Sequence, residues 1–228
     1  MSSINQLVSE IAHSVQQAES VPVRRAIRQG IIHARNQLIR HSYSNHKYVD
    51  KVLKQRFNIS IVDVPDGDIK AVVDPIDDMG VSQTIKRTIC KVPRPVRVDN
   101  NTPFHSIKSL GGISPIIICY VSEGLVKYYK NLPGMCSSPT YDYINDYVYF
   151  YNLDDSVKKV SIESVFEYPH EIKLETSDKG EYIANIDNDD EFFIPEDMIG
   201  SLKELVLKTM NPEVVRNTNE SATVNLVK

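Results

Sequence analysis

The first segment of the chain has the hydrophobic pattern of an amphipathic helix. From Ile4 onward, in INQLVSEIAHSVQQAES, apolar residues recur at intervals of three and four, so they fall on one face of an α-helix. Ser2 or Ser3 is a suitable N-cap, because a serine hydroxyl accepts a hydrogen bond from a free amide of the first turn. The residues expected on the buried face are Ile4, Leu7, Val8, Ile11, Ala12 and Val15.

A second helix is expected after a break at residues 19–22. Ser20 suits its N-cap and Pro22 its first turn, and the helix should run to about Ser42. A shorter third helix is expected to complete a helical hairpin or three-helix module over residues 1–57. The expected buried faces are Val23, Ile27, Ile31, Ala34 and Leu38 in the second helix, and Tyr48, Val49, Val52, Leu53 and Phe57 in the third.

After Asn58 the pattern changes to alternating apolar and polar residues, many of them β-branched. This alternation is typical of an antiparallel sheet, and frequent prolines keep the strands short and favour edge positions. A β-rich domain resembling a sandwich or a barrel is therefore expected over residues 58–194. The candidate strands are residues 59–64, 69–73, 84–92, 96–98, 116–121, 147–151 and 157–166.

A final helix and a polar tail complete an α+β fold. The helix is expected over residues 195–211, with Glu196 and Asp197 in the first turn, where the helix dipole favours acids. Residues 212–228 lack useful periodicity, and we expect them either to be disordered in isolation or to form an arm that orders on a partner. The helix should pack on the helical module through Ile199, Leu202, Leu205 and Val206.

The segment VSIESVFEYPHEI, residues 160–172, is expected to be a strand that stops at a corner. Pro169 has no amide hydrogen and favours an extended backbone at Tyr168, so the strand ends there. Phe166 or Tyr168 is expected to fill the gap between sheet and helices. Glu167 has no second carboxylate or nucleophile beside it in the sequence, so a catalytic role is not favoured. It either caps a local turn or pairs with a basic helix of the same or a neighbouring subunit.

The net charge of −4 is unevenly distributed. Residues 21–57 carry nine Lys or Arg against one acid, whereas six acids lie within residues 63–78 and six more within 187–197. The basic helices could serve as a solvated face, a subunit interface facing the acidic stretches, or a surface near nucleic acid. A basic module and acidic loops in one chain suit head-to-tail self-association. Arg24, Arg28 and Arg35 fall near one helix face, and Arg25 and Arg40 lie off it.

The acidic segment AVVDPIDDMG, residues 71–80, resembles the magnesium-binding motif of the inositol monophosphatase family. Asp74 and Asp77 occupy the matching positions, but Asp78 and Met79 replace the glycine and threonine, and no upstream Glu-Glu pair appears. Hard cations require several converging oxygens. A proline-bent acidic loop without a metal is therefore expected, with a magnesium phosphatase as the alternative.

The remaining reactive residues form no recognised catalytic pattern. The six histidines lack metal-ligand spacing, and neither a GxSxG elbow nor a phosphate-binding loop is present. The three cysteines contain no CxxC pair and are expected to be free thiols. No signal peptide is expected, and the longest apolar run, residues 113–121, is far shorter than the roughly 20 residues of a membrane helix. Neither an enzyme, a cofactor nor a membrane association is predicted.

Tyrosine is concentrated in one part of the sequence. Eight of the twelve tyrosines lie between Tyr120 and Tyr151. They indicate either strand faces half covered by neighbouring elements or a tyrosine-rich protein interface, since tyrosine combines a large apolar ring with a polar tip.

Five phrases in the sequence together resemble the neck or ring proteins of crAss-like and related podoviruses. They occur in the same order in those phage proteins, although Tyr168 stands where the family usually has Asp and Ser164 where it often has Gly. The phrases are INQLVSEIAHSV with VRRAIRQGIIHARNQLIRH, ICKVPRP, YDYINDYVYFYN, VSIESVFEYPHEI and FFIPEDMIGSLKELVLK.

This resemblance implies a non-enzymatic head-to-tail connector. Such a protein assembles as a ring around the DNA exit channel, expected to be a dodecamer like the portal. Its partners would be further copies of itself, the portal protein, neighbouring neck or tail proteins and packaged double-stranded DNA, in a virion assembled in the bacterial cytoplasm. The runner-up is a nucleic-acid-binding protein that uses the second and third helices. The interface or channel candidates are Arg24, Arg25, Arg28, Arg35 and Arg40, and the expected docking arm includes Asn211, Pro212, Val214, Val215 and Arg216.

Overall fold

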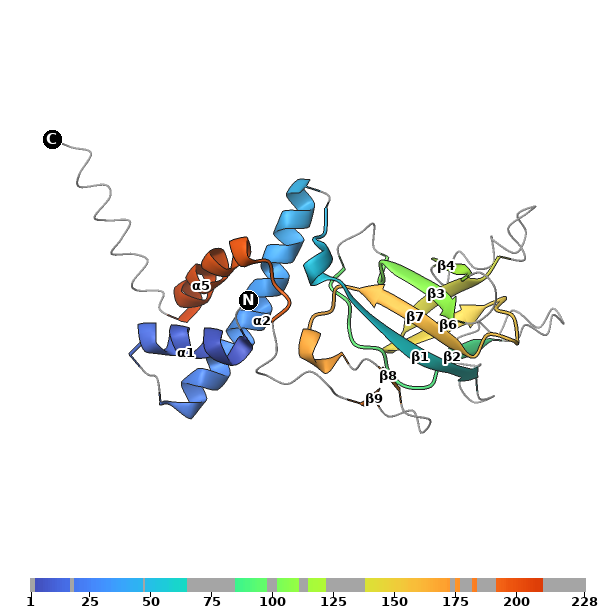
Figure 1. Ribbon diagram of the computed structural model, residues 1–228, viewed down its shortest axis with the longest axis horizontal. Coiled ribbons are helices and arrows are strands. Elements are labelled where there is room, and N and C mark those ends of the chain that lie inside the picture. The colour runs from blue at the N-terminus through green and yellow to red at the C-terminus, as the bar shows by residue number, and fades with distance from the viewer. Residues whose placement is uncertain are drawn as a thin grey trace. The chain divides into compact units, whose positions relative to one another are not determined.

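The computed structural model divides the chain into a helical unit and a β-barrel unit (Figure 1). The helical unit comprises Met1–Leu53 and Asp187–Lys228, and the barrel unit comprises Lys54–Ile186. The α+β class is confirmed: in the sequence, helices come before and after the strands of a barrel-like middle segment. The described residues are 3–16, 19–46, 48–64, 85–97, 102–110, 115–121, 138–172, 175–176, 182–183 and 192–210.

Three helices build the helical unit around one apolar core. They are α1 (Ile4–Ser14), α2 (Val21–His46) and α5 (Glu196–Met210). Ser3 is the N-cap of α1, and its hydroxyl accepts a hydrogen bond from the Gln6 amide at 3.1 Å. The predicted apolar faces of α1 and α5 lie in this core, which confirms the helical spacing of their apolar residues.

The second helix is longer than predicted and buries a wider face. Ile27, Ile31 and Ala34 are buried as expected, and Ile32 and Ile39 are buried as well. At Gly30 the helix passes close to α5, where an added Cβ would lie 3.4 Å from a methyl group of Val206. An alanine methyl group at this position would be in van der Waals contact with Val206, so α2 and α5 pack closely here.

The predicted third helix is wrong. Lys51–Leu53 forms one 3₁₀ turn, and strand β1 (Gln55–Asp63) begins almost immediately. The spacing of apolar residues from 49 to 57 fits a helix, but the alternation that starts at Gln55 and continues through Ile61 fits a strand. Alternation prevails because it places Phe57, Ile59 and Ile61 together in the barrel core.

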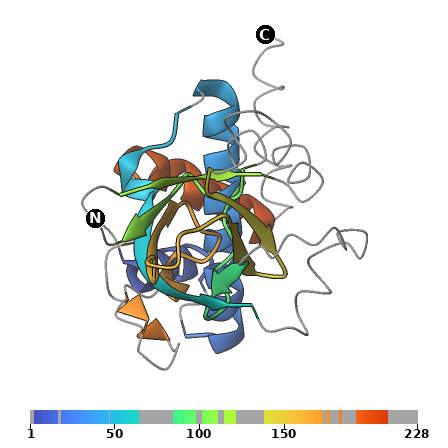
Figure 2. The same ribbon diagram turned by 90° about the vertical axis from the view of Figure 1, so that its right-hand side faces the viewer.

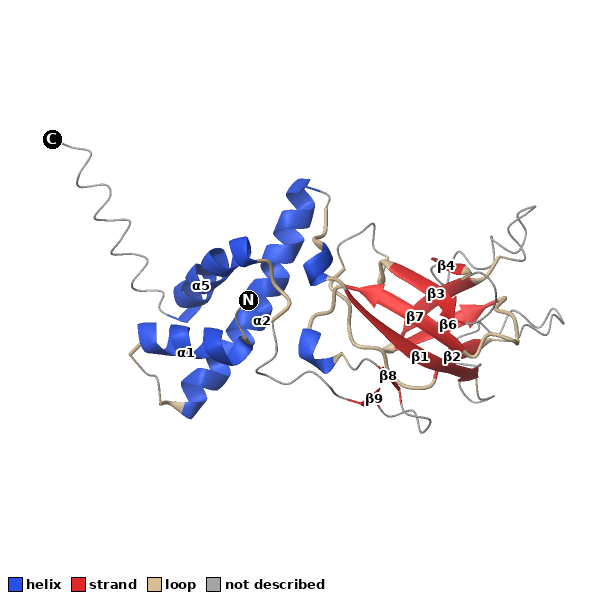
Figure 3. Ribbon diagram, viewed as in Figure 1, coloured by secondary structure: helices blue, strands red, loops and turns tan. Residues whose placement is uncertain are grey.

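Seven strands close into a barrel in the order β1-β2-β6-β5-β4-β3-β7 (Figures 2 and 3). All pairings within it are antiparallel except β4 with β5, which is parallel and corrects the purely antiparallel expectation. A separate two-stranded sheet consists of β8 (Glu175–Thr176) and β9 (Tyr182–Ile183). The other strands are β2 (Lys86–Thr88), β3 (Ser106–Leu110), β4 (Ile117–Tyr120), β5 (Thr140–Ile144), β6 (Tyr147–Tyr151) and β7 (Lys159–Ser164).

Alternating side chains of these strands fill the barrel. The central strand β7 points Val160 and Ile162 inward, and each is fully buried. Five strands overlap predicted ones, whereas β3 and β5 were not predicted. The candidate strand 69–73 lies outside the described residues.

A two-residue turn joins β5 to β6. Asn145 and Asp146 both have positive φ, 53° and 67°, as a type I′ hairpin turn requires. The Asp146 carboxylate accepts a hydrogen bond from Arg94 Nε at 3.3 Å, and its carbonyl accepts one from the Val92 amide at 2.6 Å. The turn in YDYINDYVYFYN is thus tied to the phrase ICKVPRP.

Candidate interaction surfaces

Arg35 is not a surface residue, which corrects its assignment to a subunit interface or DNA channel. Its side chain is 0% exposed within the helical unit. Its Nε donates to the Phe193 carbonyl at 2.8 Å, and the guanidinium lies over the Phe192 ring, 5.9 Å from the centroid. Burial lowers the pKa of Arg35 to about 9, so the group stays charged at neutral pH. It holds the segment before α5 against α2.

Arg24 and Arg28 connect two helices of the same unit. Arg24 donates to the Ser9 hydroxyl at 3.0 Å, and Arg28 donates to Asn5 Oδ1 at 2.6 Å. Both side chains are half-buried. Replacing Arg24, Arg28 and Arg35 by acidic residues would therefore disrupt the helical unit, so such a variant would not test a role in an interface.

The exposed part of α2 still carries an acid-free polar face. Arg25 and Arg40 are exposed, as are His33 and His41, and no Asp or Glu occurs anywhere in Val21–His46. Of the five arginine candidates, Arg25 and Arg40 are thus the two that present an exposed surface on α2.

The corner at residues 165–169 is held by main-chain contacts. The Glu167 amide donates to the Arg94 carbonyl at 2.9 Å. Pro169 begins a 3₁₀ turn, Pro169–Glu171, and its carbonyl accepts a hydrogen bond from Gln55 Nε2 at 2.8 Å. The strand ends before the proline as predicted, and these hydrogen bonds join the corner to segments far apart in the sequence.

The two aromatic residues of the corner have different environments. Phe166 is 0% exposed and lies among the rings of Phe57 and Phe104, with centroid distances of 5.6 and 6.4 Å. It therefore fills the barrel interior, rather than the predicted gap between sheet and helices. Tyr168 is 44% exposed and does not act as a plug.

A mainly polar surface lies on the outside of β1, β7 and β3. Their outward residues form three rows across the three strands, with partners fixed by the strand register. Each row contains one cationic residue and at least one serine, and only the third contains an apolar residue. The rows are Arg56, Glu163 and Ser106; Asn58, Ser161 and Lys108; and Ser60, Lys159 and Leu110. We call these nine residues the β1–β7–β3 face.

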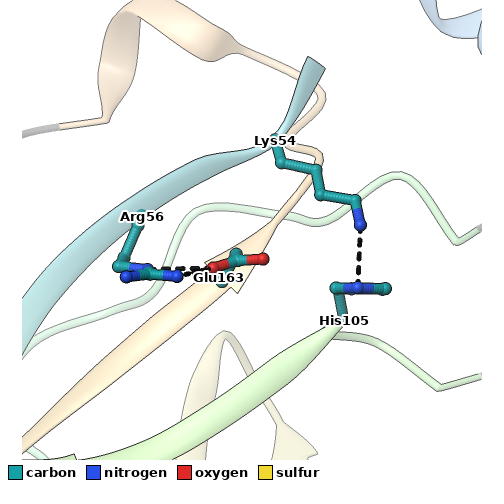
Figure 4. A network of polar contacts seen from close by, with 4 residues as sticks. All are labelled: Lys54, Arg56, His105 and Glu163. Carbon is teal, nitrogen blue, oxygen red and sulfur yellow. Dashed lines mark hydrogen bonds and ion pairs between the residues drawn. The ribbon is translucent and has the colours of Figure 1, made fainter. Parts of the chain in front are cut away.

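A polar cluster lies at one end of this face (Figure 4). The Arg56 guanidinium binds one oxygen of Glu163 through two nitrogens, with Nε at 2.9 Å. Beside it, Lys54 Nζ lies 2.8 Å from His105 Nε2. Because the lysine ammonium can only donate, a hydrogen bond between these two groups requires the imidazole to accept through Nε2.

The charge of Glu163 is stabilised by this cluster. Partial burial acts to raise its pKa, but the hydrogen bond and charge of Arg56, helped by His105 and Lys54, lower the pKa below its usual value. Glu163 remains ionised at neutral pH, and it is the one acid among the nine residues of the face.

Two further cations of the β1–β7–β3 face, unlike Arg56, are not paired with an acid among the described residues. Neither Lys108 nor Lys159 forms an ion pair with any residue in the described part of the chain. The two lysines lie 51 positions apart in the sequence and were not selected by sequence reasoning. The alternation of β7 marks Lys159 as outward-facing, but β3 gives no such signal for Lys108, and the proximity of the two lysines follows only from the strand register.

The described tyrosines between residues 120 and 151 do not form an exposed protein interface. Tyr141, Tyr149 and Tyr151 are buried, and the others are half-buried. Burial raises the pKa of Tyr141, and burial followed by the charge of Asp146 raises that of Tyr143. These side chains pack in or against the barrel, as expected for covered strand faces. Tyr128 and Tyr129 lie outside the described residues.

Several predicted features fall in parts of the chain that are not described. These are the acidic motif 71–80, with Asp74 and Asp77, and the arm containing Asn211, Pro212, Val214, Val215 and Arg216. Within the described ranges, no group of three or more His, Cys, Asp or Glu residues could hold a metal ion. Among the helices described, none is long and apolar enough to cross a membrane.

Comparison with known proteins gives one family. A family model described as phage tail ring protein 2 (CrAss_Ring_2) matches residues 6–225, nearly the whole chain of 228 residues. No curated protein matches the sequence. The match includes both the helical unit and the barrel unit, and four of the five phrases that carry the resemblance lie entirely within it. The chain belongs to the phage tail ring protein 2 family of virion structural proteins.

Proposed function

We propose that this protein is a non-enzymatic subunit of a closed ring in the phage neck, where the ring joins the portal to the tail and surrounds the DNA exit channel. The observation that carries the proposal is the match of residues 6–225 to a phage tail ring family. A ring requires a heterologous contact, in which one surface of a subunit binds a different surface of the next. The helical and barrel units provide chemically distinct surfaces for such a contact.

We place one contact surface where β3 ends and β4 begins, at Leu110, Ile116 and Ile117, which we call the apolar tip. Leu110, Ile116 and Ile117 are 36%, 44% and 63% exposed. They lie close together, because Lys108 pairs with Ile117 and the Ser109 amide donates to the Ile116 carbonyl. Apolar residues at the centre of a contact are typical of subunit interfaces, so we assign this apolar tip to contact with a neighbouring copy.

The remaining partners follow from the place of such a ring in the virion. A dodecamer would match the portal above it, and the arm at residues 211–216 would dock on the portal or on an adjacent ring. The exposed arginines of α2, Arg25 and Arg40, would face the acidic sequence stretches of a neighbouring copy. Electrostatic complementarity of this kind sets orientation and specificity.

The alternative of a nucleic-acid regulator using the second and third helices is less well supported. Residues 51–63 form a 3₁₀ turn and a strand, and Arg35 is buried. The surface that this alternative requires is therefore largely absent from the described helical unit.

Electron cryomicroscopy of the intact virion tests the proposal. Density for this barrel and its three helices should form a ring between portal and tail, with the DNA passing through its centre. Density for the chain located elsewhere in the particle, or its absence from purified virions, would overturn the proposed function.

A further inference from the structure

The β1–β7–β3 face has the composition of a surface for a polyanion. Arg56, Lys108 and Lys159 provide three cations, and the single acid, Glu163, is already bound by Arg56. The Arg56 side chain is 63% exposed and that of Glu163 is 19% exposed. Cationic charge thus predominates at the outer surface of the face, although the chain as a whole is acidic.

The strand register also sets the spacing of the two lysines. Lys108 pairs with Ser161, and Lys159 is two positions before Ser161 on the same strand. Diagonal neighbours of this kind lie about 7–8 Å apart, so two long side chains can reach separate anionic groups. Neither forms an ion pair with another residue in the portion of the chain described.

The rest of the face favours phosphate groups over a protein partner. Asn58, Ser60 and Ser106 add amide and hydroxyl donors between the cations, and contacts of this type to phosphate and sugar dominate DNA interfaces. Protein interfaces typically have a core enriched in aromatic and apolar side chains. The one apolar residue of this face, Leu110, lies in its outermost row. It belongs to the apolar tip, which we have assigned to contact with a neighbouring copy.

We propose that the β1–β7–β3 face binds the sugar–phosphate backbone of duplex DNA without regard to sequence. This inference rests on the proposed function, in which the ring surrounds DNA, and assigns the DNA-facing surface to the barrel instead of α2. No base-specific contact is required, because phosphate attraction alone supplies non-specific binding.

Fluorescence anisotropy of the full-length protein with two 30-base-pair duplexes of unrelated sequence tests the inference between 50 and 200 mM salt. The double variant K108Q/K159Q should weaken binding equally on both duplexes and reduce the slope of log K against log salt by about 2, close to one for each phosphate contact. The charge-preserving variant K108R/K159R should retain the wild-type slope. Circular dichroism melting checks that each variant is folded.

The matched control is R25Q/R40Q, which removes the same charge from the exposed face of α2. It should leave the slope unchanged. A salt slope that falls equally in K108Q/K159Q and R25Q/R40Q, or only in R25Q/R40Q, would overturn the inference. So would a wild-type protein that does not bind DNA at 50 mM salt, or one that binds polyglutamate more tightly than duplex, which would indicate an acidic protein partner. A protein that failed here but still formed the ring in virions would leave the proposed function intact.

Discussion

At the residue scale, Phe166 and Tyr168 are two aromatic residues of the corner at residues 165–169 that differ in burial. Phe166 contacts two other rings in the barrel core, whereas Tyr168 is largely exposed. We expect Phe166→Ala to lower the free energy of unfolding by about 3–5 kcal/mol, because it removes a large buried ring and leaves a cavity. Tyr168→Ala should change it by less than about 0.5 kcal/mol. Urea unfolding of both variants measures the difference, and equal losses would contradict the assignment.

The Arg56–Glu163 pair should contribute modestly and depend on pH. Because the folded state holds the pKa of Glu163 below its unfolded value, the stabilisation is present at neutral pH and is lost as the pH falls through the folded pKa. A double-mutant cycle with Arg56→Gln and Glu163→Gln should give a coupling of roughly 0.5 kcal/mol at pH 7. The coupling should decrease in 1 M salt and as the pH is lowered through the acid range. A coupling that stays unchanged under both conditions would refute the ion pair.

Some residue roles could not be derived from sequence because they depend on distant partners. Arg35 appeared to belong to a basic helix face, yet its partner is a carbonyl 158 residues away. The proximity of Lys108 and Lys159 likewise follows from barrel register and not from spacing along the chain.

At the scale of elements, Gly30 of α2 lies against Val206 of α5. Gly30→Ala should stabilise the protein by about 0.5–1 kcal/mol, since alanine favours the helix and its Cβ meets Val206 at an ordinary contact distance. Gly30→Val should destabilise it, because the added methyl groups have no room against Val206.

Gly200 in α5 is the matched control for this prediction. A Cβ added there meets nothing within 4 Å, so Gly200→Ala should stabilise through helix propensity and Gly200→Val should be tolerated better than Gly30→Val. Thermal melting of the four variants measures these effects. Similar behaviour of the two valine variants would show that α2 and α5 do not pack at Gly30.

The elements with a strong hydrophobic period were predictable, and those without one were not. The faces of α1 and α5, the alternation of β7 and the apolar and aromatic run of β6 follow directly from the sequence. Strand β3, SIKSL, has only two apolar residues, and β5, TYDYI, includes a buried aspartate, Asp142. Both become strands because neighbours on each side supply hydrogen bonds. The prediction of a third helix was wrong for the opposite reason. The apolar residues there have helical spacing, but the segment forms a strand because it pairs within the sheet.

At the scale of the whole molecule, the proposed contact between neighbouring copies can be tested at the exposed apolar tip. Ile117→Asp places a charge where a neighbouring copy is expected to pack, so it should abolish ring assembly while the monomer stays folded, because Ile117 is already 63% exposed. Sedimentation velocity and circular dichroism together measure this. Normal assembly of the variant would remove the tip from the interface.

The central claim is that this chain forms a closed ring. Native mass measurement combined with electron microscopy of the purified protein, alone and mixed with the portal, tests it most directly. We predict a single closed assembly with a mass twelve times the 25.9 kDa of one chain and a central channel wide enough for duplex DNA. A protein that remains monomeric both alone and with the portal, at all concentrations tested, would contradict the account.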